Sequence, residues 1–81
     1  NKIVPRDEIV AEAERYAQLI VKNGPVAVSA IKKSVLTTSG MTLKEGLDKE
    51  TELAMPVFAT KDAQEGPRAF MEKREPNYIG E

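Results

Sequence analysis

Apolar residues recur with helical spacing near the start of the chain. They predict a helix from about Asp7 to Lys22, because they trace one stripe of the 3.6-residue period while polar residues fill the other face. Asp7 is expected to be the N-cap, since its side chain can accept a bond from an unpaired backbone N–H. The run Asn23-Gly24-Pro25 is expected to end the helix, since glycine can adopt the left-handed conformation after a helix end and Pro25 cannot continue the hydrogen-bond ladder. The stripe consists of Ile9, Val10, Ala13, Tyr16, Ala17, Ile20 and Val21.

A second apolar pattern follows this break and extends to about Thr38. Pro25 suits the first position of a helix, because its fixed φ is helical and its missing N–H would have no partner there. Several residues are β-branched, so propensity alone would allow a strand, but the length and the spacing favour a helix. A turn is expected over residues 37–40. The apolar positions are Ala27, Val28, Ile31, Val35 and Leu36.

A third helix is predicted from Thr42 to about Phe58. Thr42 and Glu45 have the spacing of a capping box, in which each side chain bonds the other residue's backbone N–H. Pro56 lies inside this pattern and lacks a backbone donor, so a kink or an early end near Leu53 is expected.

A fourth helix is predicted from about Lys61 to Lys73, with Thr60 as its N-cap. Gly66-Pro67 is a weak point at which this helix is expected to split. Proline at position 76 prevents the helix from continuing.

These segments predict an all-α fold of three to four short helices. Residues 1–76 are expected to form one helical domain, and residues 77–81 an irregular C-terminal tail. A chain of 81 residues buries a modest fraction of its surface and needs additional support. With neither Cys nor His in the sequence, a disulfide is excluded and the commonest metal ligands are missing. A partner surface is the expected support.

The charge of the chain excludes some classes of function. Twelve basic and 13 acidic residues give a net charge of −1, without the basic stripe that nucleic-acid binding needs. No apolar run approaches the about 20 residues that cross a bilayer, so no membrane segment is expected. No basic-then-apolar leader is present, so no signal peptide is expected. The chain begins with Asn1 and not Met, which predicts a processed or truncated product.

The sequence offers no set of catalytic residues. A pair of carboxylates can act as acid and base when a pocket separates their pKa values. The acidic residues of the last two helices are expected instead to form a solvated surface, as such residues usually do. No catalytic residue, metal ligand or cofactor is predicted. The residues considered are Asp48, Glu50, Glu52, Asp62 and Glu65.

The most specific pattern is F-x-[ST]-x-D-x-x-E-G-x-x-A-F-x-E-K-R-x-P over residues 58–76. It resembles the closing signature of the enoyl-CoA hydratase/isomerase (crotonase) family. The run Asn23-Gly24-Pro25-x-Ala27 and the segment Gly40 to Leu43 resemble the same family further upstream. Pro56 and Pro67 depart from the residues usual in the family at these positions. The matching positions of the signature are Phe58, Thr60, Asp62, Glu65, Gly66, Ala69, Phe70, Glu72, Lys73, Arg74 and Pro76.

The resemblance implies that the chain is the C-terminal helical region of a larger enzyme, behind a spiral α/β core that carries the catalytic groups. It implies packing into homo-trimers or hexamers, closure of one side of the acyl-CoA site, and hydration of trans-2-enoyl-CoA. The compartment would be the bacterial cytoplasm or, in a eukaryote, the mitochondrial matrix. By the same resemblance, Phe70 and Lys73 would contact coenzyme A, through the adenine ring and a phosphate.

Three alternatives stay open at this point. Phe70 lies on an apolar stripe and could belong to a core, and Lys73 could serve only the helix dipole. The parent enzyme could be an isomerase or another member of the family, because the difference lies in the core. A free-standing helical interaction module is the alternative from a different class.

Overall fold

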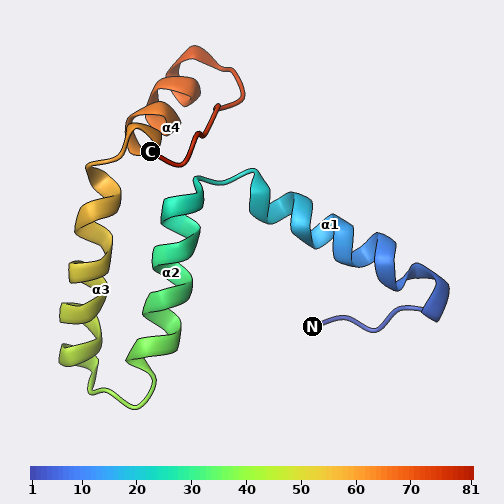
Figure 1. The fold of residues 1–81 in the computed structure, drawn as a ribbon, viewed down its shortest axis with the longest axis horizontal. Helices are drawn as coiled ribbons and strands as arrows, with labels where there is room; N and C mark the ends of the chain where they lie inside the picture. The colour runs from blue at the N-terminus through green and yellow to red at the C-terminus, as the bar shows by residue number, and fades with distance from the viewer.

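The computed structural model describes residues 1–81 and contains helices but no strand (Figure 1). A 3₁₀ turn, η1, precedes four α-helices, and the predicted all-α class is therefore confirmed. The elements are η1 (Arg6–Glu8), α1 (Ile9–Val21), α2 (Pro25–Thr38), α3 (Leu43–Phe58) and α4 (Lys61–Glu72). No helix is long and apolar enough to cross a membrane.

The two ends of α1 differ from the prediction. Asp7 is not an N-cap but lies within η1, and Glu8 precedes α1 without a side-chain cap. The reason is local: the Glu8 N–H already donates to the Pro5 carbonyl at 3.0 Å, so the chain is turned before an extended cap residue can form. Gly24 is not left-handed (φ −59°), because the Asn23 side-chain amide donates to the Leu19 carbonyl at 2.8 Å and satisfies the helix end.

Helices α2 and α3 form an antiparallel hairpin, which is the most extensive helix–helix contact of the chain (Figure 1). The predicted capping box is confirmed: the Glu45 N–H donates to Thr42 Oγ1, and the Thr42 N–H donates to the Glu45 carboxylate at 2.9 Å. Gly40, with a φ of 85°, makes the turn between the two helices.

Neither internal proline ends its helix early. Helix α3 continues through Pro56 to Phe58, and α4 continues through Pro67 to Glu72. Pro56 lies in the last turn of its helix, and this turn is closed by bonds from the Ala59 N–H to the Pro56 carbonyl and from the Thr60 N–H to the Val57 carbonyl. Pro67 is exposed. The part of α4 that precedes it is held by hydrogen bonds from the backbone N–H groups of Asn77 and Ile79 in the C-terminal tail.

The tail folds back along α4 (Figure 1). Asp62 accepts bonds from the backbone N–H groups of Ile79 and Gly80 at 2.8 and 2.9 Å, and its own N–H donates to the Glu81 carbonyl. Tyr78 lies beside Gly24 and Gly66, so it bridges α4 and the joint between α1 and α2. The tail has no helix and is bound through specific hydrogen bonds.

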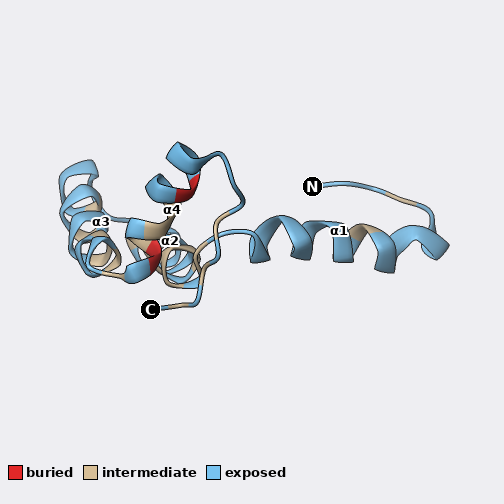
Figure 2. Cartoon of the chain, turned by 90° about the horizontal axis from the view of Figure 1, so that it is seen from above, coloured by how far each residue is buried: buried red, intermediate tan, exposed pale blue.

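The chain has almost no core. Only Ala69 and Asp62 are buried, and α1 projects away from the hairpin (Figures 1 and 2). The radius of gyration is 16.0 Å, against about 12 Å for a compact domain of this length. These helices therefore leave most of their large hydrophobic side chains exposed.

Candidate functional site

The C-terminal end of α4 has an unusual backbone. Lys73 ends the helix in the left-handed conformation, with φ 53° and ψ 42°, and it is the only non-glycine residue with a positive φ. The Arg74 N–H donates to the Ala69 carbonyl at 3.1 Å, which closes the helix in the manner of a Schellman motif. Glycine usually occupies such a position because it has no Cβ to clash. A lysine here therefore carries a conformational cost.

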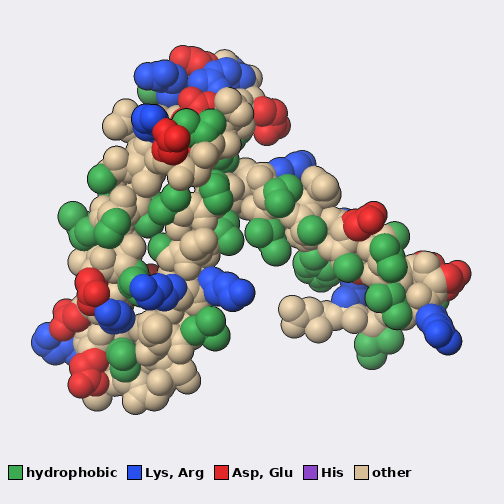
Figure 3. Space-filling model, in the orientation of Figure 1, with side chains coloured by type: hydrophobic (Ala, Val, Ile, Leu, Met, Phe, Trp, Pro, Cys, Tyr) green, Lys and Arg blue, Asp and Glu red, His purple; other side chains and the backbone are tan.

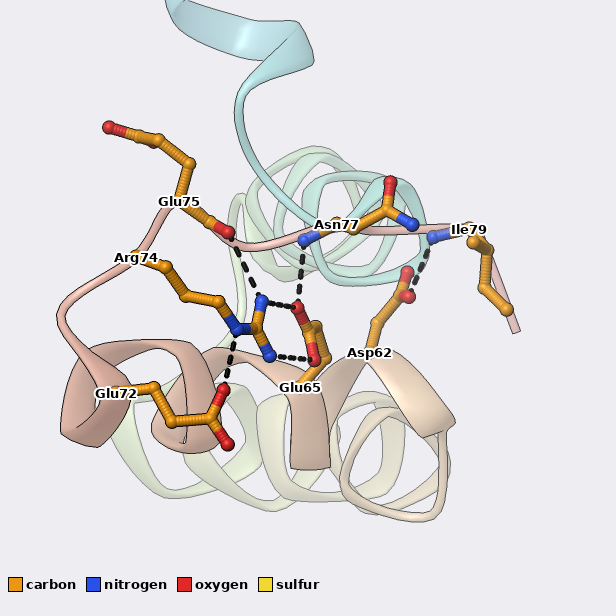
Figure 4. Close-up of polar contacts among 7 residues, drawn as sticks. All are labelled: Asp62, Glu65, Glu72, Arg74, Glu75, Asn77 and Ile79. Carbon is orange, nitrogen blue, oxygen red and sulfur yellow. Dashed lines mark hydrogen bonds and ion pairs between the residues drawn. The ribbon is translucent and has the colours of Figure 1, made fainter.

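Arg74 connects this turn to the rest of α4 (Figure 4). Its Nη1 and Nη2 atoms donate to the two oxygens of Glu65 at 2.6 and 3.0 Å, and its Nε donates to Glu72 at 2.6 Å. Glu65 also accepts a bond from the Asn77 N–H at 2.9 Å. Charge-assisted, two-pronged pairs of this kind fix orientation as well as attract.

The electrostatics of this cluster favour the charged forms. The Arg74 guanidinium and the Asn77 N–H lower the pKa of Glu65 to about 2, and the two carboxylates raise the pKa of Arg74 above its ordinary value. The Glu65 side chain is only 16% exposed, which limits competition from water.

Two of the acidic residues expected on a solvated surface do not lie on one. Asp62 is 5% exposed and binds the tail, and Glu65 binds Arg74. Composition and periodicity alone could not identify them, because their partners lie 9 to 18 residues further along the chain. The signal was their presence in the 58–76 signature. The other three, Asp48, Glu50 and Glu52, are exposed as expected.

The two predicted coenzyme A contacts lie at this same end of α4. Phe70 is 85% exposed, so it belongs to no core within this chain. Lys73 is exposed and forms no ion pair with another residue of the chain. In the space-filling view, charged side chains of both signs gather over α4 and again over the α2–α3 hairpin near its turn, and hydrophobic ones lie along α1 and the hairpin (Figure 3). An aromatic ring and an ammonium group are thus both available to a ligand or a neighbouring chain.

A shallow apolar groove runs between α2 and α3. It measures about 210 Å³ and contains no pair of catalytic groups, and no cluster of residues in the chain could hold a metal ion. The groove is suited to apolar side chains or an acyl chain rather than to chemistry. Its lining consists of Ala27, Ala30, Ile31, Ser34, Val35, Glu50, Leu53, Ala54, Val57 and Phe58.

The sequence matches the enoyl-CoA hydratase/isomerase family over residues 1–81. It is 42% identical to an enoyl-CoA hydratase of Mycobacterium tuberculosis, over 94% of this chain and 29% of that protein. It is 40% identical to the mitochondrial enoyl-CoA hydratase of Pongo abelii, over 96% of this chain and 27% of that protein. A crystal structure of an enoyl-CoA hydratase/isomerase from Mycobacterium paratuberculosis matches with a TM-score of 0.93 and 34% identity, over 98% and 31% of the two chains. The chain therefore spans under a third of the length of these proteins.

Proposed function

The chain belongs to the enoyl-CoA hydratase/isomerase family, and we propose that it is the C-terminal segment of an enoyl-CoA hydratase, where it mediates oligomerisation and covers one side of the acyl-CoA site. The parent enzyme would add water across the double bond of a trans-2-enoyl-CoA in fatty-acid oxidation. The observation that carries the proposal is the family match over the whole chain, together with relatives named as hydratases. The catalytic groups would lie in the preceding core, and the isolated segment would have no turnover.

The exposed apolar surface supports the packing role. Large hydrophobic side chains of α1, α2 and α3 lie exposed, and the chain has one buried hydrophobic residue. In the parent enzyme these faces would pack on its own N-terminal core and on neighbouring subunits of a trimer or hexamer. A free-standing interaction module would need a core of its own, and the structure has too little burial for one.

Phe70 and Lys73 would contact coenzyme A, which enters as part of the substrate, without a separate cofactor. The exposed Phe70 ring can cover an adenine, and the Lys73 ammonium can pair with a phosphate. The compartment would be the bacterial cytoplasm or the mitochondrial matrix, in line with the bacterial and mitochondrial origins of the relatives.

An isomerase is the second candidate, because the matching family includes both reactions. Incubating the intact parent enzyme with crotonyl-CoA and, separately, with a 3-enoyl-CoA decides between them. Hydration of crotonyl-CoA supports the proposal. Isomerisation of the 3-enoyl substrate without hydration overturns it in favour of the isomerase.

The coenzyme A contact is tested with Lys73→Glu in the intact enzyme. An exposed ion pair contributes about 1 kcal/mol and its reversal somewhat more, so KM for crotonyl-CoA should rise about tenfold. Crotonyl-pantetheine, which lacks the nucleotide, is the matched control, and its KM should stay unchanged. An unchanged KM for crotonyl-CoA would show that Lys73 does not contact the nucleotide.

A further inference from the structure

The left-handed backbone at Lys73 is strained in a way that glycine would avoid. Such conformations persist only where the surroundings hold them, and they concentrate at functional sites. At Lys73 the neighbouring residue Arg74 can hold the backbone, because its side chain is hydrogen-bonded to three groups. Its guanidinium contacts Glu65, Glu72 and the Glu75 carbonyl (Figure 4).

The geometry of Arg74 defines the path of the chain at residue 73. Glu65 lies two turns before the helix end and Glu72 lies at its last residue, so a side chain bound to both must leave Lys73 in a tight reversal. The Lys73 N–H donates to the Phe70 carbonyl at 3.2 Å, and the Arg74 N–H to the Ala69 carbonyl. The Lys73 backbone is thus held on both sides, while its ammonium forms no ion pair within the chain.

The tail strengthens this arrangement. Glu65 Oε1, which accepts from Arg74 Nη1, also accepts the Asn77 N–H. Asp62, one helical turn earlier, accepts bonds from the N–H groups of Ile79 and Gly80. The carboxylate of Glu65 is therefore fixed by two partners from beyond the helix, which leaves it little freedom to release Arg74.

We propose that Glu65, Arg74 and Glu72 form a clamp that holds residue 73 in the left-handed conformation and thereby aims the Lys73 ammonium at a phosphate of the bound coenzyme A thioester. The three are positioning residues that act through Lys73. This inference rests on the proposed contact between Lys73 and coenzyme A. It also explains why a lysine occupies a position suited to glycine: glycine would remove the strain but would supply no charge.

The central experiment replaces Arg74 with Lys in the intact parent enzyme. Lysine keeps the charge but cannot bind Glu65 in a two-pronged manner and contact Glu72 as well. We expect KM for crotonyl-CoA to rise about three- to tenfold with kcat unchanged. KM for crotonyl-pantetheine should not change. Should Arg74→Lys fail to fold, Glu72→Gln, which weakens only the contact to Nε, carries the same test with a smaller effect.

A double-mutant cycle separates positioning from general stability. Lys73→Met removes the ammonium, so adding Arg74→Lys to it should raise KM no further. If Arg74→Lys raises KM equally in both backgrounds, or raises it equally for the pantetheine substrate, its effect is structural and the inference is wrong. If Lys73→Met itself leaves KM unchanged, the proposed contact fails and the clamp's role fails with it. If Lys73→Met raises KM and Arg74→Lys does not, only the clamp is refuted.

The backbone strain has an independent readout in the pair Lys73→Gly and Lys73→Ala. Both remove the ammonium and should raise KM for crotonyl-CoA alike. Only glycine is free of strain at a positive φ, so Lys73→Gly should have the higher melting temperature. Equal melting temperatures would show that residue 73 is not held in the left-handed conformation in the enzyme.

Discussion

On its own, the 81-residue chain should not fold as a cooperative monomer. The structure exposes 6863 Å², whereas a compact monomer of 8.9 kDa exposes about 4,800 Å². The excess is therefore about 2,000 Å². With somewhat more than half of it apolar and about 25 cal/mol per Å², the missing burial is worth about 30 kcal/mol. That exceeds the net stability of ordinary domains, which is about 5–15 kcal/mol.

The measurement is made on the purified chain of residues 1–81. Light scattering after size-exclusion chromatography gives its mass. Circular dichroism at increasing urea concentration shows whether helicity is lost gradually or in a sigmoidal transition. We expect either a monomer that loses helicity gradually, or self-association through the exposed apolar faces. Phe58→Ser is the matched variant: its side chain is 72% exposed, so it should reduce association and leave the helicity of the monomer unchanged.

One result would refute this reasoning about the missing core. It is a monomeric mass at about 100 μM together with a sigmoidal urea transition whose slope reaches about 1 kcal/mol per M, as for a small two-state domain. Such a result would mean that the four helices bury enough apolar surface against one another to fold without a partner. Their arrangement around α1 would then differ from the open one described above.

Two further predictions concern α4 in the intact enzyme. The contribution of Glu65 to stability should be complete above about pH 4.5, its ordinary pKa, and should be lost as the pH falls toward its folded pKa of about 2. Melting temperatures of the parent enzyme and its Glu65→Gln variant should therefore converge below about pH 4.5, and a constant difference down to pH 3 would contradict this assignment. Gly66→Ala would place a Cβ 3.1 Å from Tyr78 Oη, which opposes the gain of about 1 kcal/mol in helix propensity. Gly66→Ala should raise the melting temperature more in a Tyr78→Phe background than in the unchanged protein. Equal changes in both backgrounds would show that the Tyr78 side chain moves aside without an energetic cost.

Local patterns in the sequence sufficed for the helices and for the N-caps of α3 and α4. The predicted segments agree with α1 to α4 within two residues at each end, and the capping box of Thr42 and Glu45 is present. Errors arose where two local effects competed. The early end of α3 near Pro56 and the split of α4 at Pro67 did not form, because the bonds of the flanking turns outweigh one lost donor. Asn23 ended α1 in place of a left-handed Gly24.

What the sequence by itself determined is the helical class, the helix limits and, through the signature over residues 58–76, the family. The helical class and the helix limits depend on residues within about one or two helical turns of each other, and the family is identified by the residue types of the signature. Only the tertiary structure decided that Asp62 and Glu65 bind the tail and Arg74, and that Lys73 is left-handed. These features depend on where the chain returns after α4 ends, and periodicity carries no information about contacts that form when the chain folds back on itself.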